Sequence, residues 1–148
     1  MQDKSHKRNL AFLAFVLIAA TAYYLFVSQG TPSLRFSAEK RLFSFVGAKH
    51  TAVVFSFDTL EALEFHEGDA AAFGAPVTGG QVYGGYAYGT WKSEPYGEYE
   101  AFVSMRIPAF ILAKDQEKSA VFNVSNTETT RSLYEQLYAF WQSQPSMQ

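Results

Sequence analysis

The stretch that decides the fold is residues 81–105, which read QVYGGYAYGTWKSEPYGEYEAFVSM. From Glu98 to Met105, apolar residues alternate with acidic or polar ones, which is typical of a strand with one buried face. A proline and a glycine mark Lys92–Gly97 as a turn. Before that turn, Gln81–Trp91 reads as a strand whose glycines indicate a bulge or a sharp bend. The stretch therefore predicts two strands joined by a turn, in a sheet that curls toward a barrel.

Short strands are also predicted on either side of this stretch. Upstream, Leu42–Val46 alternates, and Thr51–Phe57 (TAVVFSF) has the β-branched and aromatic composition of a buried strand. Downstream, Ala109–Ala113 and Ala120–Val124 flank Lys114–Lys118 (KDQEK), which reads as a charged hairpin turn. The predicted fold class is therefore mainly β, with a curled antiparallel sheet that forms a small, partly open barrel.

Two segments between these strands carry mixed signals. In Asp58–Glu67 (DTLEALEFHE), Asp58 and Glu61 resemble a helix capping box, whereas apolar residues alternate as they do in a strand. Both interpretations stay open from the residues alone. Gly68–Gly80 is a long run of small residues without a strong pattern, which predicts either a flap or a poorly ordered loop.

The β region is followed by a predicted amphipathic helix at residues 126–143. Ser125 and Glu128 form a capping box, with Asn126 as a rival cap, and Pro145 closes the helix. The apolar residues that recur on one face at helical spacing are Leu133, Tyr134, Leu137, Tyr138 and Trp141. We expect this single C-terminal helix to cap the open end of the barrel.

A membrane-spanning segment is predicted near the N-terminus. Residues 10–27 read LAFLAFVLIAATAYYLFV, in which only Thr21 is not apolar, and no charge lies between Arg8 and Arg35. Eighteen helical residues span roughly 27 Å, close to the hydrocarbon thickness of a bilayer. Ala20–Ala22 resembles a signal-peptide cleavage site, but apolar residues continue beyond it, which favours an uncleaved anchor.

The chain is thus divided into a basic tail at 1–9, a transmembrane helix at 10–28, a linker at 29–33 and one domain at 34–144. The tail carries Lys4, Lys7 and Arg8 against one acid, Asp3. That bias favours a cytoplasmic N-terminus and a soluble domain outside the cytoplasm. The flank beyond the membrane segment also carries Lys and Arg residues, so basic residues lie on both sides of the segment. We expect a single-pass protein of the cell membrane.

Composition excludes several classes of function. The 148 residues include 12 Lys and Arg against 14 Asp and Glu, a net charge of -2, which excludes a generally basic nucleic-acid binder. The absence of cysteine excludes disulfides and thiolate chemistry. His66 lies near acidic residues, but a solvated acidic loop explains this arrangement better than a metal site. No cofactor is predicted, and no pattern of catalytic residues indicates an enzyme.

The strongest candidate for a partner surface is aromatic. Its residues, six within a span of 17, are Tyr83, Tyr86, Tyr88, Trp91, Tyr96 and Tyr99. They form either an ordinary half-buried face with cross-strand pairs or a surface for a peptide, a partner protein or the bilayer interface. Candidate contacts to lipid headgroups are Arg35, Lys40, Arg41 and Lys49. The net charge of -4 over residues 34–144, from nine basic and thirteen acidic residues, disfavours lipid recognition.

The layout resembles the bacterial pleckstrin-homology-like domains over roughly residues 34–141. The matching stretches are FSFDTLEALEF, GGYAYGTWKSEPYGEYEAFV and VFNVSNTETTRSLYEQLYAFW. The resemblance implies a curled antiparallel sheet capped by the helix, and it favours a strand at Leu60–Phe65. That family, mostly uncharacterised, has no shared catalytic residues, and many of its members have more than one membrane span.

These observations predict a non-enzymatic, single-pass membrane protein that presents a pleckstrin-homology-like domain as a protein-interaction module. The alternative is a domain that binds a lipid or small ligand at the membrane surface, with Gly68–Gly80 as a flap. The two readings differ in the residues they use. A protein partner would contact the aromatic residues, whereas a lipid headgroup would contact the basic flank.

Overall fold

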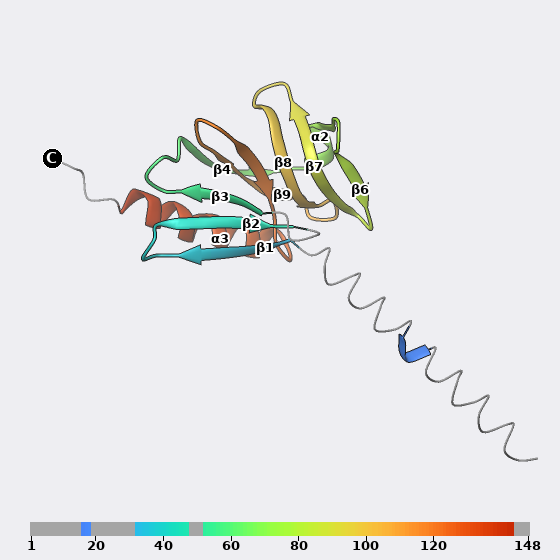
Figure 1. Cartoon of the computed structure of the whole chain (residues 1–148), viewed down its shortest axis with the longest axis horizontal. Coiled ribbons are helices and arrows are strands. Elements are labelled where there is room, and N and C mark those ends of the chain that lie inside the picture. The colour runs from blue at the N-terminus through green and yellow to red at the C-terminus, as the bar shows by residue number, and fades with distance from the viewer. Residues whose placement is uncertain (1–15, 19–31, 48–51, 144–148) are drawn as a thin grey trace, which may run out of the picture.

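The computed structural model describes residues 16–18, 32–47 and 52–143, and the account below concerns these residues. They form a mainly β structure of two sheets and one long C-terminal helix (Figure 1). The strands are β1 (Ser33–Ser37), β2 (Leu42–Val46), β3 (Ala52–Ser56), β4 (Ala62–Glu67), β5 (Ala75–Pro76), β6 (Gln81–Tyr83), β7 (Tyr86–Ser93), β8 (Gly97–Ser104), β9 (Ala109–Lys114) and β10 (Ser119–Phe122). The helices are α2 (Ala70–Phe73) and α3 (Thr127–Gln142).

The strands pair in two separate sheets that do not close into a barrel within the described residues. β1, β2 and β3 form an antiparallel three-stranded sheet, and the other strands follow the order β4-β9-β10-β8-β7-β5, with β6 also on β7. All pairs are antiparallel except β8 with β10, which run parallel. The expected mainly β class and the C-terminal helix are thus confirmed, whereas an entirely antiparallel sheet is wrong.

The parallel pair arises because β10 inserts between β8 and β9, and a buried asparagine joins the strands at that point. Asn123, 1% exposed, accepts a hydrogen bond from the Ser104 backbone N–H at 2.8 Å. Its amide donates to the carbonyl oxygens of Ser104 and Ala109, each at 3.0 Å. These three bonds satisfy backbone groups where β8 leaves the sheet and β9 begins.

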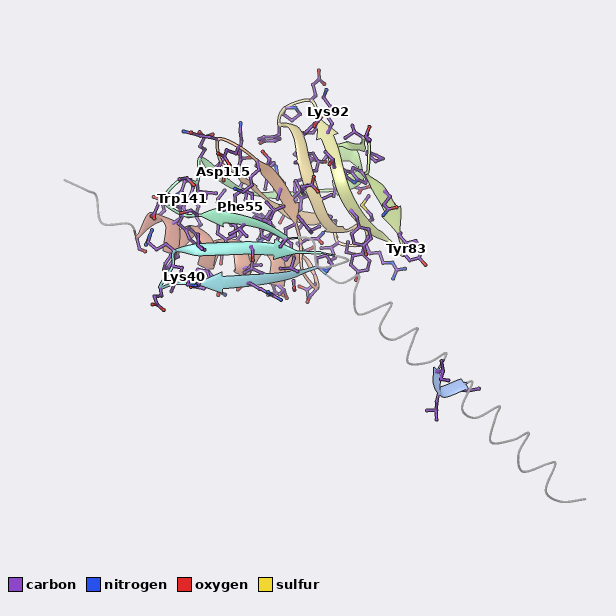
Figure 2. All side chains as sticks on the ribbon, viewed as in Figure 1. Lys40, Phe55, Tyr83, Lys92, Asp115 and Trp141 are labelled. Atoms are coloured by element: carbon purple, nitrogen blue, oxygen red, sulfur yellow. The ribbon has the colours of Figure 1, made fainter. Side chains whose placement is uncertain are left out.

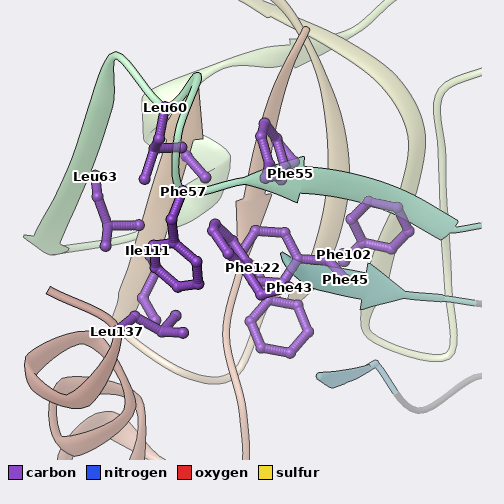
Figure 3. Packing of buried hydrophobic residues seen from close by; sticks show 12 residues of the cluster. Phe43, Phe45, Phe55, Phe57, Leu60, Leu63, Phe102, Ile111, Phe122 and Leu137 are labelled. Carbon is purple, nitrogen blue, oxygen red and sulfur yellow. The ribbon is translucent and has the colours of Figure 1, made fainter. Parts of the chain in front are cut away.

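The first core cluster lies between the two sheets and beneath α3, and phenylalanine dominates it (Figure 3). Phe45 stacks on Phe122 with ring centroids 4.3 Å apart, which joins β2 to β10. Phe43 stacks on Phe55 at 5.3 Å within the small sheet. The alternation of β2 is therefore confirmed, because its two phenylalanines point inward. α3 packs against β4 and β9, and Leu137 is its buried apolar residue.

A second cluster lies on the opposite face of the large sheet. It contains Trp91 of β7, Tyr99 of β8 and Phe110 of β9, and Ala70 and Phe73 of α2 lie against it. Residues 68–80 are therefore part of the packed fold, through α2 and through β5 on β7. The strand expected at Leu60–Phe65 is found at 62–67 as β4, so the helical interpretation of Asp58–Glu67 is wrong.

Two local expectations are wrong. Gln81–Trp91 is not one bent strand, because Gly84 and Gly85, at φ +58° and +81°, form the turn of a hairpin between β6 and β7. The cap of α3 is Asn126, whose side chain accepts from the Thr129 N–H, rather than a capping box begun by Ser125. Ser125 has φ +48° and precedes the cap.

The expected transmembrane helix at 10–28 lies outside the described residues, apart from the helical residues Val16–Ile18. Across 16–18, 32–47 and 52–143, no helix has the length and apolar character needed to cross a membrane. The basic tail at 1–9 also lies outside the described residues, as does most of the linker.

Candidate functional site

The six aromatic residues of the candidate partner surface are divided among three places. Tyr83, Tyr86 and Tyr88 share one face of the β6–β7 hairpin, and we call these three residues the tyrosine shelf. Trp91 and Tyr99 are each 4% exposed in the second core cluster. Tyr96 lies in the turn between β7 and β8.

The tyrosine shelf is built by the strand register. Tyr83 lies opposite Tyr86 across the hairpin, and Tyr86 and Tyr88 are two residues apart on the same face of β7. The rings of Tyr86 and Tyr88 stack with centroids 6.2 Å apart and an interplanar angle of 26°. Tyr83 is 57% exposed, whereas the other two are half-buried. Burial, with a smaller effect of Tyr86, raises the pKa of Tyr88, so the Tyr88 hydroxyl stays protonated at neutral pH.

The next residue along this face of β7 is polar. Thr90 donates a hydrogen bond to the Glu100 carboxylate on β8 at 2.8 Å, directly across the strand pair. The shelf therefore presents three aromatic rings with phenolic hydroxyls, bordered by a fixed acidic side chain. An amphipathic surface of this kind is common in protein interfaces, where tyrosine is enriched.

Trp91 and Tyr99 support the hairpin from its other face. The Trp91 indole N–H donates to the carbonyl oxygen of Tyr88, on the same strand, at 3.0 Å. This bond fixes the orientation of the buried Trp91 ring. Burial raises the pKa of Tyr99 to about 12. Both residues are core residues, so a partner could reach neither without unfolding this face. Alternation along β7 separates Trp91 from Tyr86 and Tyr88, whereas the turn at Gly84 places Tyr83 on the same face as those two tyrosines.

Tyr96 belongs to a polar cluster with Glu64 and His66 of β4. The Tyr96 hydroxyl donates to a Glu64 carboxylate oxygen, and the same oxygen lies 2.8 Å from the His66 Nε2. The His66 ring stacks on Phe110 with centroids 5.2 Å apart. The hydrogen bond from Tyr96 is the main cause that lowers the pKa of Glu64, burial opposes it, and His66 lowers it further. The sequence carried no signal for this contact, which joins residues 32 positions apart.

Of the acidic residues near His66, Glu64 contacts it, whereas Glu67 pairs with another residue. Glu67 follows on the other face of β4 and pairs with Arg131 of α3, whose guanidinium also lies over the Phe65 ring at 5.3 Å. Among residues 16–18, 32–47 and 52–143, no group of three or more His, Cys, Asp or Glu side chains could hold a metal ion. The cluster around Glu64 is therefore a hydrogen-bonded contact between β4 and the β7–β8 turn.

The structure describes three of the four basic candidates for lipid contact. Arg35 is exposed on β1, and Lys40 lies beyond the end of that strand, in the turn before β2. Arg41 donates from its Nε to Asp58 at 2.8 Å, and its guanidinium lies over the Phe140 ring at 5.1 Å. Lys49 lies outside the described residues. Because Arg41 already has an anionic partner, it is poorly suited to recruit a phosphate.

An open groove of about 440 Å³ lies at the end of the molecule opposite the shelf. Its lining comes from the β3–β4 turn at 58–60 and the β9–β10 turn at 115–118. Asp115 accepts from the backbone N–H groups of Glu117 and Lys118 and pairs with the Lys118 ammonium at 3.0 Å. Burial is the largest single effect on the pKa of Asp115 and raises it, but the hydrogen bonds from Glu117 and Lys118 and the Lys118 charge together outweigh burial, so the pKa is lowered.

The chain was compared with known proteins at three levels. No family model matches it, no curated protein matches it, and no solved structure matches it. The functional argument therefore depends on the geometry of this chain alone.

Proposed function

We propose that this protein is a non-enzymatic, single-pass membrane protein whose β domain binds another protein through the tyrosine shelf. The apolar run at 10–27 supports the anchor, and the basic tail supports a domain outside the cytoplasm. The main observation in support of a binding role is the tyrosine shelf. Three tyrosines share one face of the β6–β7 hairpin and belong to neither core cluster, whereas Trp91, on the opposite face of β7, is buried.

Several observations favour a protein over a lipid headgroup or small ligand as the partner. The domain has a net charge of -4, and Arg41, one of the basic candidates for lipid contact, already pairs with Asp58. The cavity inside the second core cluster measures about 10 Å³, which is room for a single water molecule. A small ligand therefore has no pocket in that cluster. The tyrosine shelf is therefore a better candidate for recognition than this cavity.

Tyrosine suits this role because it offers a large contact area with few rotatable bonds and a hydroxyl that can bond at the rim. Residues of this type dominate the binding energy of many interfaces, and their truncation commonly costs about 2 kcal/mol or more each. Replacing Tyr86 and Tyr88 with serine should thus reduce partner affinity by at least tenfold, as about 1.4 kcal/mol corresponds to a factor of 10.

The test is site-specific photo-crosslinking of the full chain in the membranes of its native cell. A photoreactive phenylalanine analogue replaces Tyr86 or Tyr88 in turn, and Tyr138 serves as the matched control because it is an exposed tyrosine of α3. The proposal predicts the same adduct from positions 86 and 88, its loss when the other shelf tyrosine is changed to serine, and none from position 138. Equal adducts from all three positions, or none from the shelf, would contradict it.

A further inference from the structure

Two neighbouring residues at one end of the domain have the largest exposed fractions among the exposed large hydrophobic side chains of residues 32–47 and 52–143. Val82 and Tyr83 of β6 are 52% and 57% exposed. They precede the Gly84–Gly85 turn, and Arg106 of the β8–β9 turn lies beside it, since a Cβ built on Gly85 would be 3.2 Å from the Arg106 Nε. We call Val82, Tyr83 and Arg106 the hairpin tip.

The hairpin tip is on the same end of the domain as the start of β1. Leu34 pairs with Phe45, and the Phe45 ring lies 6.5 Å from that of Phe102 on β8. Phe102 in turn pairs with Tyr88 of β7, next to the tip. Figure 2 shows Tyr83 at this end, whereas Lys92 lies at the other end of the hairpin and Lys40 at the far end of the small sheet.

Chain length places this end of the domain close to the bilayer. The apolar run ends at Val27 and β1 begins at Ser33. Six residue steps reach at most about 20 Å when fully extended. Because the tip and the start of β1 share one end of the domain, the tip is the part of β6 and β7 that a membrane anchor brings nearest to the lipid.

The chemistry of the tip suits the interface between lipid and water. Tyrosine is enriched at the level of the headgroups, where its ring meets acyl chains and its hydroxyl stays hydrated. An exposed valine adds apolar area, and an exposed arginine can reach lipid phosphates. We propose that the hairpin tip rests in the headgroup region of the bilayer, so that the tyrosine shelf begins at the membrane surface and faces along it.

This inference rests on the membrane anchor of the proposed function, and it adds an orientation. β7 has eight residues, so its far turn lies roughly 26 Å from the tip at about 3.3 Å per residue. Glu94, in that far turn, is exposed and should stay in water. The two ends of the hairpin therefore provide a matched pair of positions for measuring depth.

The experiment uses the full chain in vesicles of phosphatidylcholine and phosphatidylglycerol. The chain has no cysteine, so Val82→Cys and Glu94→Cys each give a single site for an environment-sensitive fluorophore. Lipids that carry a nitroxide near the headgroup should quench the probe at 82 at least about twofold more than the probe at 94. In the Val82→Cys chain, Arg106→Glu should weaken that quenching, whereas Lys92→Glu, at the far end of the hairpin, should not.

Each alternative outcome is distinct. If the chain does not float with the vesicles, the anchor of the proposed function fails and this inference fails with it. If the chain floats but positions 82 and 94 are quenched equally, the anchor stands and the orientation is wrong. If the stronger quenching of the probe at 82 disappears when each vesicle holds one chain, it depends on contact between copies of the chain. That result would also overturn the inference.

Discussion

The hydrogen bonds of Asn123 make the most demanding prediction about stability. Asn123→Ala removes three bonds, of 2.8, 3.0 and 3.0 Å, and leaves the Ser104 N–H and the carbonyls of Ser104 and Ala109 without them. Ser104 is 9% exposed and Ala109 is fully buried, so water replaces these bonds poorly. At about 1 kcal/mol for each net bond, and more where a group stays unsatisfied, we expect a loss of about 3 kcal/mol or more.

The assay is urea unfolding of the full chain in mild detergent, with tryptophan fluorescence as the signal that monitors unfolding. Trp91 lies in the second core cluster and Trp141 packs against the first, so the signal reports on both sides of the large sheet. In a separate thermal unfolding experiment, a loss of about 3 kcal/mol should lower the melting temperature by roughly 12 °C in a domain of this size. Asn126→Ala is the control, since it removes one exposed cap bond of the same chemical type.

A second variant at the same position separates hydrogen bonding from packing. Asn123→Asp keeps an acceptor for the Ser104 N–H, but at neutral pH it turns a carboxylate toward two carbonyl oxygens. Repulsion and burial should raise the folded-state pKa of this carboxyl. The Asn123→Asp variant should therefore become more stable relative to Asn123→Ala as the pH falls. The protonated carboxyl group can then donate a hydrogen bond to a carbonyl oxygen again. A loss below about 1 kcal/mol for Asn123→Ala would refute the argument that these bonds join β8, β9 and β10.

Three further predictions concern local contacts. Asn126→Ala should lower the free energy of unfolding in urea by about 1 kcal/mol, because the Asn126 side chain accepts the cap bond from the Thr129 N–H. Ser125→Ala should lower it by only a few tenths of a kcal/mol. The reverse order would show that Ser125 is the cap. Gly89→Ala should destabilise the domain by more than about 2 kcal/mol, since φ is +71° and a Cβ would lie 2.1 Å from the Gly79 carbonyl oxygen; a neutral result would contradict this close approach. The pKa of Glu64 is lowered from its ordinary value of 4.5, so its contact with Tyr96 stabilises the fold above that pH and is lost as pH falls through the folded-state pKa. Tyr96→Phe should thus lower stability at pH 7 and by less at pH 3, and a pH-independent difference would show that the carboxylate is not involved.

Strand positions were predictable where one residue pattern determined them. β2 and β9 were predicted because burial of alternating or continuous apolar residues leaves a local trace in the sequence. α3 was predicted within one residue at each end, since its apolar face has helical spacing and its cap residue is an asparagine. These elements are specified by residues that lie close together in the chain.

Pairing between strands was less predictable because distant residues determine it. Nothing near Phe122 in the sequence shows that β10 inserts beside β8, and the parallel pair follows from the fit of buried rings such as Phe45 on Phe122. The turn at Gly84 was read as a bend within one strand, because a glycine pair marks a bulge and a hairpin equally well. That single turn decides which tyrosines share a face.

The candidate site was predicted in composition but not in arrangement. All six aromatic residues lie on or beside the two strands expected, yet only Tyr83, Tyr86 and Tyr88 form one surface. Trp91 differs from Tyr88 in burial because alternation along β7 turns it to the opposite face. The basic flank was grouped by sequence distance, and nothing in the neighbouring residues showed that Arg41 pairs with Asp58, 17 positions away.

The most direct test of the central claim is the accessibility of one labelled position in intact cells. Glu94→Cys places a single thiol in the exposed β7–β8 turn, far from the hairpin tip, of a chain that otherwise has none. The account predicts that a membrane-impermeant maleimide labels this chain in intact cells and that the labelled chain stays in the membrane fraction after alkaline extraction. Labelling only after lysis, or release of the chain by alkali, would contradict a membrane-anchored domain displayed outside the cytoplasm.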